Sequence, residues 1–231
     1  MMIHRYKFIL LFMAVFLSVQ ILVQISFAQE KKMNSLTNQD VIRLPAPVFK
    51  GKISLEETIK NRQSTRDFSA VPLTLKELSQ LFWAVQGITR DWGARTVPSA
   101  GALFPLEVYV VLQEGVFQYS SGNHSLTRHG GRDIRPQLAY AALGQESVRT
   151  APAVFVIAAV YERTAKKYGN RAERYVKIET GHAAQNLLLQ ATALNLGAVP
   201  IGAFHDEKVK QVMNLPENHE PVYLIPVGRK H

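Results

Sequence analysis

Residues 153–160 read AVFVIAAV, and this uninterrupted apolar run constrains the fold more than any other feature of the sequence. Its length and its β-branched residues favour a strand over a helix. Because no polar residue alternates with the apolar ones, neither face of this strand is expected to meet water. The run therefore predicts a strand that is buried on both faces.

The segments around this strand predict helices and strands in mixed order. Ser54 with Glu57 and Thr74 with Glu77 each fit a capping box, which marks the start of a helix. Further helices are expected over 133–143, 171–196 and 206–214, and further strands over 108–112, 117–120, 125–127 and 222–227. Since strands and helices do not alternate strictly, the sequence predicts an α+β fold and not a Rossmann-type sheet.

The first 28 residues have the features of a secretory signal peptide. Arg5 and Lys7 precede an apolar run over 8–19, and the small residues at 26 and 28 fit a cleavage site. An uncleaved membrane anchor is the alternative, although polar residues keep the run short for spanning a bilayer. We therefore expect export to the periplasm or the extracellular space, with no stable membrane span after cleavage. An uncleaved segment would leave the protein membrane-anchored.

The rest of the chain divides unevenly. Residues 29–50 are polar and then rich in proline, which predicts a linker or an N-terminal arm. Residues 51–231 contain no repeat and no second linker, so they are expected to form one domain. A segment of that length is sufficient to bury a core.

Composition and motifs exclude several classes of protein. The chain has no cysteine, which excludes disulfide scaffolds, zinc–thiolate sites and a cysteine nucleophile. Its histidines show no metal-ligand spacing, so no metal is expected. The formal net charge of +9 suits an anionic ligand, but the basic residues are dispersed, so nucleic-acid binding is not expected. Sequence motifs of dinucleotide, P-loop, zincin and α/β-hydrolase sites are absent.

Two short segments are candidates for ligand contacts, one with an anion and the other with a flat ligand. If residues 62–66 (RQSTR) are extended, Arg62, Ser64 and Arg66 point to one side, where they suit a phosphate. A solvated basic turn is the alternative. The segment 98–105 (PSAGALFP) has small residues between two prolines. Its backbone can lie against a flat ligand, or it can be an ordinary loop.

The helix expected over 171–196 is unusual in its small residues. Small side chains let two helix backbones approach closely. Tight packing inside one chain and a helix at a dimer interface are both compatible with this composition. The small residues are Gly181, Ala183, Ala184, Ala191 and Ala193.

Taken together, these segments resemble the nitroreductase-like FMN superfamily, and specifically its SagB/ThcOx-type dehydrogenase branch. The matching strings are RQSTRDF (62–68), PSAGALFPLE (98–107), KYGNR (167–171), ETGHAAQNL (179–187), VPIGAF (199–204) and PVGR (226–229). They occur in the family's order and spacing. The ordered set supports the resemblance far more strongly than any single string does.

The resemblance implies a nitroreductase-like α+β fold with a central, mostly antiparallel sheet, a helix-mediated homodimer, and FMN bound between the subunits. It also implies a residue set for the cofactor, with roles for its phosphate and ribityl end, its ring and its reactive edge. These residues are, respectively, Arg62, Gln63, Ser64, Arg66 and Arg229; Pro98, Ser99, Ala100, Gly101 and Ala102; and Gly202 and Ala203.

The resemblance further implies that Lys167 and Tyr168 form a catalytic pair. Hydride removal from a substrate needs a base within hydrogen-bond reach to take the accompanying proton. A lysine can serve if desolvation lowers its pKa, and a neighbouring tyrosine can relay the proton. Without the resemblance, the same residues are interpreted as a solvated polar loop.

The implied activity is that of an exported FMN-dependent oxidoreductase, a dehydrogenase or oxidase that takes a hydride and a proton from a small or peptidic substrate. Members of this branch oxidise azoline rings in peptides, so an azoline-like substrate is one option. The export signal separates this chain from those cytoplasmic enzymes. The alternatives are an NAD(P)H-dependent nitro- or quinone reductase and a basic binding protein that has lost the flavin.

Overall fold

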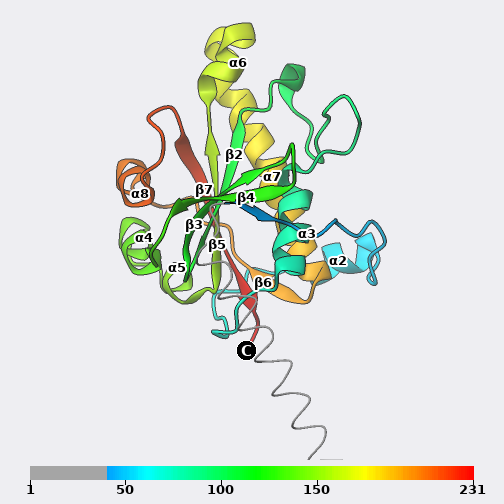
Figure 1. Cartoon of the computed structure of the whole chain (residues 1–231), viewed down its shortest axis with the longest axis vertical. Helices are drawn as coiled ribbons and strands as arrows, with labels where there is room; N and C mark the ends of the chain where they lie inside the picture. The colour runs from blue at the N-terminus through cyan, green and yellow to red at the C-terminus, as the bar shows by residue number, and fades with distance from the viewer. Residues whose placement is uncertain (1–40) are drawn as a thin grey trace, which may run out of the picture. The chain divides into compact units, whose positions relative to one another are not determined.

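The computed structural model describes residues 41–231, in which one seven-stranded antiparallel sheet has the order β1-β4-β3-β2-β5-β7-β6 (Figure 1). The strands are β1 (Val41–Arg43), β2 (Leu106–Leu112), β3 (Gly115–Ser120), β4 (Ser125–Gly130), β5 (Ala153–Ala159), β6 (Leu196–Ala198) and β7 (Glu220–Arg229). The signal peptide expected over 1–28 lies outside the described residues, as does the first half of the expected arm.

The central strand is β5, which lies between β2 and β7 and is buried at all seven positions. Its side chains alternate between two layers of helices. The Phe155 ring lies 4.8 Å from the Phe82 ring of α3 (Leu75–Gln86), whereas Val154 and Val156 join a buried cluster with residues of the opposite layer. The structure thus confirms the buried strand and the α+β fold that the sequence predicts.

Helices cover both faces of the sheet (Figure 1). Besides α3, the helices are α2 (Leu55–Asn61), α4 (Arg135–Ala141), α5 (Glu146–Thr150), α6 (Tyr161–Tyr168), α7 (Ala172–Ala193) and α8 (Asp206–Met213), with the 3₁₀ turns η2 (Ala100–Ala102) and η3 (Gly169–Arg171). α3 packs against the long helix α7 on one face, and α4, α5 and α8 share the buried cluster on the other. Two short helices, α5 and α6, were not expected from the sequence.

The two predicted capping boxes differ in the structure. At the start of α3, the Thr74 hydroxyl accepts from the Glu77 amide, and the Glu77 carboxylate accepts from the Thr74 amide at 2.6 Å, which confirms a complete box. At the start of α2, Ser54 accepts from the Glu57 amide, but the Glu57 side chain returns no bond. The box at the start of α2 is therefore only half formed.

The small residues of α7 fall on two sides of the helix. Ala183, Ala184 and Ala191 are buried against the rest of the same chain. Gly181 is exposed, with no atom within 4 Å of the position that a Cβ would take, and Ile178 is 48% exposed on the same helix. Packing inside one chain thus explains the three alanines and leaves one face of α7 uncovered.

The described end of the expected arm is part of the fold. β1 pairs with β4, and the Leu44 amide donates to the carbonyl of His124. Further along, the Ser79 hydroxyl of α3 donates to the carbonyl of Pro45, and His124 Nε2 lies 2.7 Å from the same hydroxyl. These bonds attach residues 41–45 to the sheet and to α3. Within residues 41–231, no helix has the length and apolar character that crossing a membrane requires.

Candidate functional site

Residues 62–66 run as an extended segment beside the edge strand β6. Arg62 ends α2 with extended backbone angles, and Ser64 forms a parallel bridge with Ala198. The Thr65 amide donates to the carbonyl of Ala198 at 3.0 Å. This confirms the extended conformation on which the prediction of a phosphate-binding segment depends.

The orientation of the segment is set by Thr65 and Gly197. A Cβ on Gly197 would lie 2.6 Å from Cγ2 of Thr65, so the threonine side chain packs directly on the backbone of β6. Because side chains alternate along an extended chain, Ser64 and Arg66 point away from β6. Both are exposed, as is Gln63.

The two arginines of this segment have unused hydrogen-bond donors. Among residues 41–231, neither the side chain of Arg62 nor that of Arg66 has a hydrogen-bond or ion-pair partner. A guanidinium group presents five N–H donors in a fixed fork, which suits a phosphate. These side chains are therefore available to an external anion.

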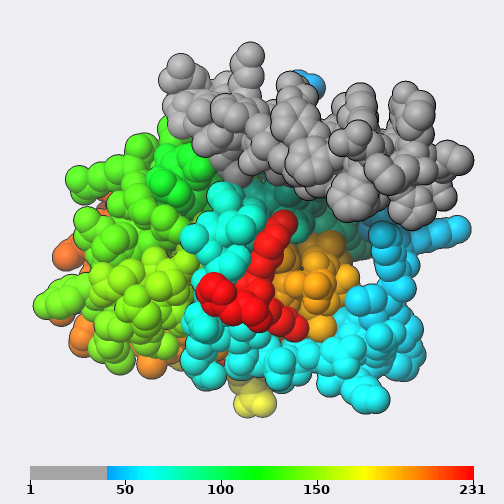
Figure 2. All heavy atoms as spheres, turned by 90° about the horizontal axis from the view of Figure 1, so that it is seen from below, coloured from blue at the N-terminus to red at the C-terminus, as the bar shows by residue number. Residues whose placement is uncertain are grey.

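Arg229 lies at the end of β7 and is paired through the sheet with Leu196 of β6. Because 62–66 borders the other side of β6, Arg229 and Arg62 flank the same short strand. One nitrogen of Arg229, Nη2, binds Glu77, while Nη1 is buried with no partner. In Figure 2 the red C-terminal end of the chain lies among cyan and orange segments, the colours of the chain near residues 60–70 and 195–205.

The segment 98–105 forms a tight turn around η2. Gly101, Ala102 and Phe104 all have positive φ angles, of 64°, 54° and 46°. Pro98, Gly101 and Ala102 are exposed, and Ser99 and Ala100 are half-buried. The exposed backbone of this turn fits the expectation that it lies against a flat ligand.

The turn lies directly against the expected catalytic pair. A Cβ on Gly101 would lie 3.0 Å from the Tyr168 hydroxyl and 3.2 Å from Nζ of Lys167. Glycine is therefore the residue that lets this turn approach the two polar groups. The structure brings together two parts of the predicted site that are more than sixty residues apart in the sequence.

Lys167 and Tyr168 form the last turn of α6, so the polar loop that the residues alone predict is wrong. Tyr168 is half-buried, with its ring 5.0 Å from that of Tyr175 in an edge-to-face contact. Lys167 is exposed. A single chain thus does not supply the desolvation that a lysine base requires.

Gly202 lines a pocket of about 790 Å³ between the start of α7 and the strand β7. The pocket also includes Gly169, which directly follows the Lys167–Tyr168 pair. Ala203 is exposed, and its carbonyl accepts a hydrogen bond from Nε2 of Gln145 at 2.9 Å. Of the two expected reactive-edge residues, Gly202 therefore lines a pocket that also includes the residue after α6, and Ala203 does not line it.

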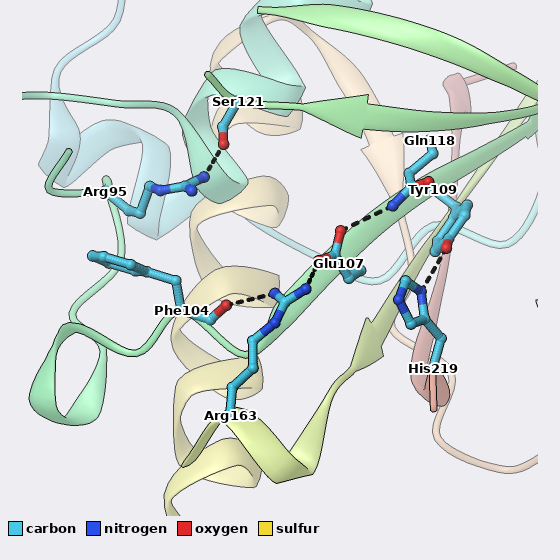
Figure 3. Close-up of polar contacts among 8 residues, drawn as sticks. All are labelled: Arg95, Phe104, Glu107, Tyr109, Gln118, Ser121, Arg163 and His219. Carbon is cyan, nitrogen blue, oxygen red and sulfur yellow. Dashed lines mark hydrogen bonds and ion pairs between the residues drawn. The ribbon is translucent and has the colours of Figure 1, made fainter. Parts of the chain in front are cut away.

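A polar cluster behind the 98–105 turn was missed by the sequence analysis (Figure 3). Arg163 of α6 forms an ion pair with Glu107 of β2 at 2.5 Å and donates to the carbonyl of Phe104 at 3.0 Å. Arg95 bonds to the Ser121 hydroxyl, and its guanidinium lies 5.0 Å from the centre of the Phe104 ring. These contacts hold the turn on the side where it borders a pocket of about 420 Å³.

Glu179 of α7 is the other residue that the sequence analysis left without a role of its own. Its side chain is buried, and burial raises the pKa of the carboxyl group to about 7. A hydrogen bond from Ser99 and the charge of Arg95 act in the opposite direction and are smaller. The sequence could have indicated a buried glutamate here, because Glu179 lies within a helix whose neighbouring alanines are also buried.

Comparisons with known proteins agree with this arrangement. A protein of Methanocaldococcus jannaschii named for the nitroreductases is 45% identical over 185 residues, which are 78% of this chain and 92% of that protein. A crystal structure from Ralstonia eutropha, titled with the same family, matches with a TM-score of 0.77 and 33% identity over 84% of this chain and 90% of the other.

A structure of the NADPH:FMN oxidoreductase from Vibrio harveyi complexed with NAD⁺ matches with a TM-score of 0.57 and 24% identity, over 76% of this chain and 68% of that one. At that identity the match shows the fold alone. The family model described as "Nitroreductase family" matches residues 59–229, a range that contains the extended arginine segment, the turn, the lysine–tyrosine pair and Arg229. The chain therefore belongs to the nitroreductase family.

Proposed function

We propose that this chain is an exported FMN-dependent oxidoreductase of the SagB/ThcOx type, acting as a dehydrogenase or oxidase on a small or peptidic substrate. The observation that carries the proposal is the set of unpaired guanidinium donors around β6. The guanidinium groups of Arg62 and Arg66 have no partner among the described residues, and Nη1 of Arg229 is buried without one. A buried, unpaired donor is costly unless a ligand satisfies it.

The residues present fit FMN at both ends. Arg62, Ser64 and Arg66 would hold its phosphate, with Arg229 on the other side of β6. The backbone of the 98–102 turn would lie along the ring, and Gly202 in the pocket lining would border its reactive edge. When bound, FMN supplies a two-electron acceptor for hydride.

The part of this chain in the reaction would then be to orient the substrate and to manage its proton. Lys167 and Tyr168 lie beside Gly101, at one edge of the proposed ring site. One of them would accept the proton that leaves the substrate with the hydride, and the other would relay it. Because Lys167 is exposed in the single chain, its desolvation would have to come from the flavin, the substrate or a partner subunit.

A homodimer would complete this site. The exposed face of α7, which includes Ile178 and Gly181, is free for contact with a second subunit. Light scattering of the FMN-bound protein should therefore give twice the mass of the chain. A monomer at micromolar concentration with FMN bound would contradict the dimer.

The second candidate is an NAD(P)H-dependent nitro- or quinone reductase. The similarity to the Methanocaldococcus jannaschii protein that is named a nitroreductase favours it, and the expected export signal disfavours it, since reduced nicotinamides are scarce outside the cytoplasm. A flavin-free binding protein of the same fold is a third option, which the intact arginine set disfavours.

Two measurements separate these functions. The absorption spectrum and mass of the ligand that copurifies identify FMN or its absence, and a colourless chain that takes up no added FMN would sink the proposal. Rapid mixing of the flavoprotein with NADPH or NADH then tests the reductase. Flavin bleaching within milliseconds would favour the reductase, whereas a flavin that stays oxidised would favour the dehydrogenase or oxidase.

A further inference from the structure

The helix α6 projects from one end of the sheet and has few apolar contacts to hold it (Figure 1). It has eight residues, of which Thr164 alone is buried, and its last turn carries Lys167 and Tyr168. A helix of this length is marginal by itself in water, so contacts with the rest of the chain must fix its position. The contacts that fix α6 therefore also determine where its last two residues lie.

Arg163 joins α6 to the 98–105 turn and to the sheet (Figure 3). Its Nη1 donates to the carbonyl of Phe104 at 3.0 Å, and its Nη2 pairs with Oε1 of Glu107 at 2.5 Å. The other carboxylate oxygen of Glu107 accepts from Nε2 of Gln118 at 3.0 Å. One guanidinium group thus bonds directly to the turn and, through the carboxylate, connects α6 with β2 and β3.

Arg163 and Lys167 contact the same turn from one side of α6. They are four residues apart, so their side chains lie one above the other on a single face of the helix. Arg163 meets the turn at Phe104, and Lys167 meets it at Gly101, where a Cβ would lie 3.2 Å from Nζ. α6 therefore lies along the turn, with Arg163 at one end of the contact and the Lys167–Tyr168 pair at the other.

The turn needs contacts of this kind because its backbone conformation is costly. Gly101, Ala102 and Phe104 have positive φ angles, and residues with a Cβ rarely adopt them. Such a backbone persists only where surrounding contacts hold it. As an ion pair alone, Arg163 with Glu107 would contribute little, since the arginine side chain is 40% exposed. The bond to the Phe104 carbonyl is what distinguishes Arg163 from an ordinary surface arginine.

We propose that Arg163 is a positioning residue, which holds Lys167 and Tyr168 in register with the 98–105 turn through its bond to the Phe104 carbonyl. The inference rests on the proposed function in that this turn is the part expected to lie along the flavin ring. An arginine serves here because its two terminal nitrogens bond to two different acceptors. A lysine has one nitrogen, so we expect it to keep the pairing with Glu107 and to lose the bond to the turn.

The test separates the bond to the turn from the ion pair. Arg163→Lys keeps a positive charge beside Glu107, and Arg163→Ala removes both interactions. Glu107→Gln removes the ion pair but leaves Arg163 and the Phe104 carbonyl in place. Arg132→Gln is the control, an exposed arginine in the turn before α4. Each change is made in the full chain, and if Arg163→Ala does not fold, Arg163→Lys carries the measurements.

Hydrogen exchange of the flavin-free chain measures how firmly the turn is held. The amides of Ala102 and Phe104 both donate to Ser99, within the turn. In the two Arg163 variants they should exchange about tenfold faster than in the control, as expected when one hydrogen bond is lost. The Val110 amide, in the middle of β2, reports opening of the sheet and should exchange at the control rate in Arg163→Lys.

The outcomes that would overturn the proposal are specific. Glu107→Gln should leave exchange at the turn within about twofold of the control, because a part-exposed ion pair contributes little. Exchange at the turn that equals the control in the Arg163 variants, or that rises as much in Glu107→Gln, would contradict a role for the carbonyl bond. An equal acceleration at Val110 would do the same, since it would show a general loss of stability.

FMN affinity of the full chain, measured by fluorescence, links this role to the flavin. Arg163→Lys should weaken binding of FMN and of riboflavin by the same factor, about three- to tenfold, because the turn is expected at the ring and not at the phosphate. A loss for FMN alone would overturn the inference. If no chain binds FMN while exchange at the turn differs, the proposed function fails and the positioning role of Arg163 stands.

Discussion

Nη2 of Arg229 lies 2.9 Å from Oε1 of Glu77, the residue that also completes the capping box at the start of α3. One carboxylate thus fixes a helix terminus and orients a guanidinium of the proposed phosphate site. Replacing it separates the two roles. Glu77→Ala removes both, whereas Glu77→Gln keeps a side chain that can complete a capping box.

We therefore expect Glu77→Ala to lower the free energy of unfolding by about 1–2 kcal/mol and Glu77→Gln by less than half as much. Both should weaken FMN binding, because Arg229 loses the carboxylate that orients it. Urea unfolding of the flavin-free protein and fluorescence titration measure the two effects separately. An unchanged FMN affinity in both variants would show that Arg229 does not need Glu77.

The second prediction concerns the phosphate end of the site. Arg62→Ala or Arg66→Ala should weaken FMN binding about ten- to a hundredfold, since each removes a charge-assisted bond to the phosphate. Riboflavin, which has no phosphate, should be affected less. Arg132→Ala is the control, an exposed arginine in the turn before α4 whose loss changes the net charge equally. Equal losses for FMN and riboflavin would exclude both arginines as phosphate ligands.

Much of this fold follows from local sequence patterns. The apolar run of β5, the capping signals of α3 and the small-residue helix α7 each encode their own structure, because burial and capping depend on neighbouring residues. β1 and β6 have three residues each and are strands because β4 and β7 lie beside them. Such pairings depend on the tertiary fold, which a local pattern does not contain.

The same distinction applies to the site. The common orientation of Arg62, Ser64 and Arg66 could be predicted, because alternate side chains of an extended segment point to the same side. The contacts of Phe104 in the 98–105 turn could not, since Arg95 and Arg163 come from two separate segments that the fold alone brings together. The proximity of Gly101 to Tyr168 is likewise a tertiary contact. Only the family's motif order indicated that those two segments share a site.

The third prediction concerns the lysine–tyrosine pair. Lys167→Ala and Tyr168→Phe should leave the spectrum of the bound flavin intact but slow substrate-driven flavin reduction about a hundredfold or more, because the departing proton loses its acceptor or relay. Lys166→Ala, one residue earlier on the exposed side of α6, is the matched control. Rapid mixing with the true substrate is the measurement. Reduction at the parent rate in both variants would assign the proton to another group.

The fourth prediction uses the contact between the turn and that pair. In Gly101→Ala the new methyl group lies 3.0 Å from the Tyr168 hydroxyl, and the residue must keep a φ of 64°. The backbone cost is about 1–2 kcal/mol in the free energy of unfolding, and the contact displaces the tips of Lys167 and Tyr168. The variant should therefore be less stable and slower in flavin reduction at the same time. A loss of stability alone would indicate that the pair tolerates displacement.

The last prediction is the pH dependence of stability that Glu179 imposes. Burial raises its carboxyl pKa from 4.5 to about 7, so between these two values the folded state binds a proton that the unfolded state releases. The free energy of unfolding should therefore fall as pH rises from about 4.5 to about 7 and stay level above that. Glu179→Gln lacks this titration, so its stability relative to the parent should rise by up to about 3 kcal/mol across the same interval.

Urea unfolding of the flavin-free variants at pH 5, 6, 7 and 8 measures this difference. In Glu173→Gln, the control on the same helix, the lost carboxyl has a pKa lowered by its hydrogen bond to Lys177, so its difference from the parent should stay constant above pH 5. A Glu179→Gln difference that is the same at pH 5 and pH 8 would mean that the carboxyl titrates outside this range.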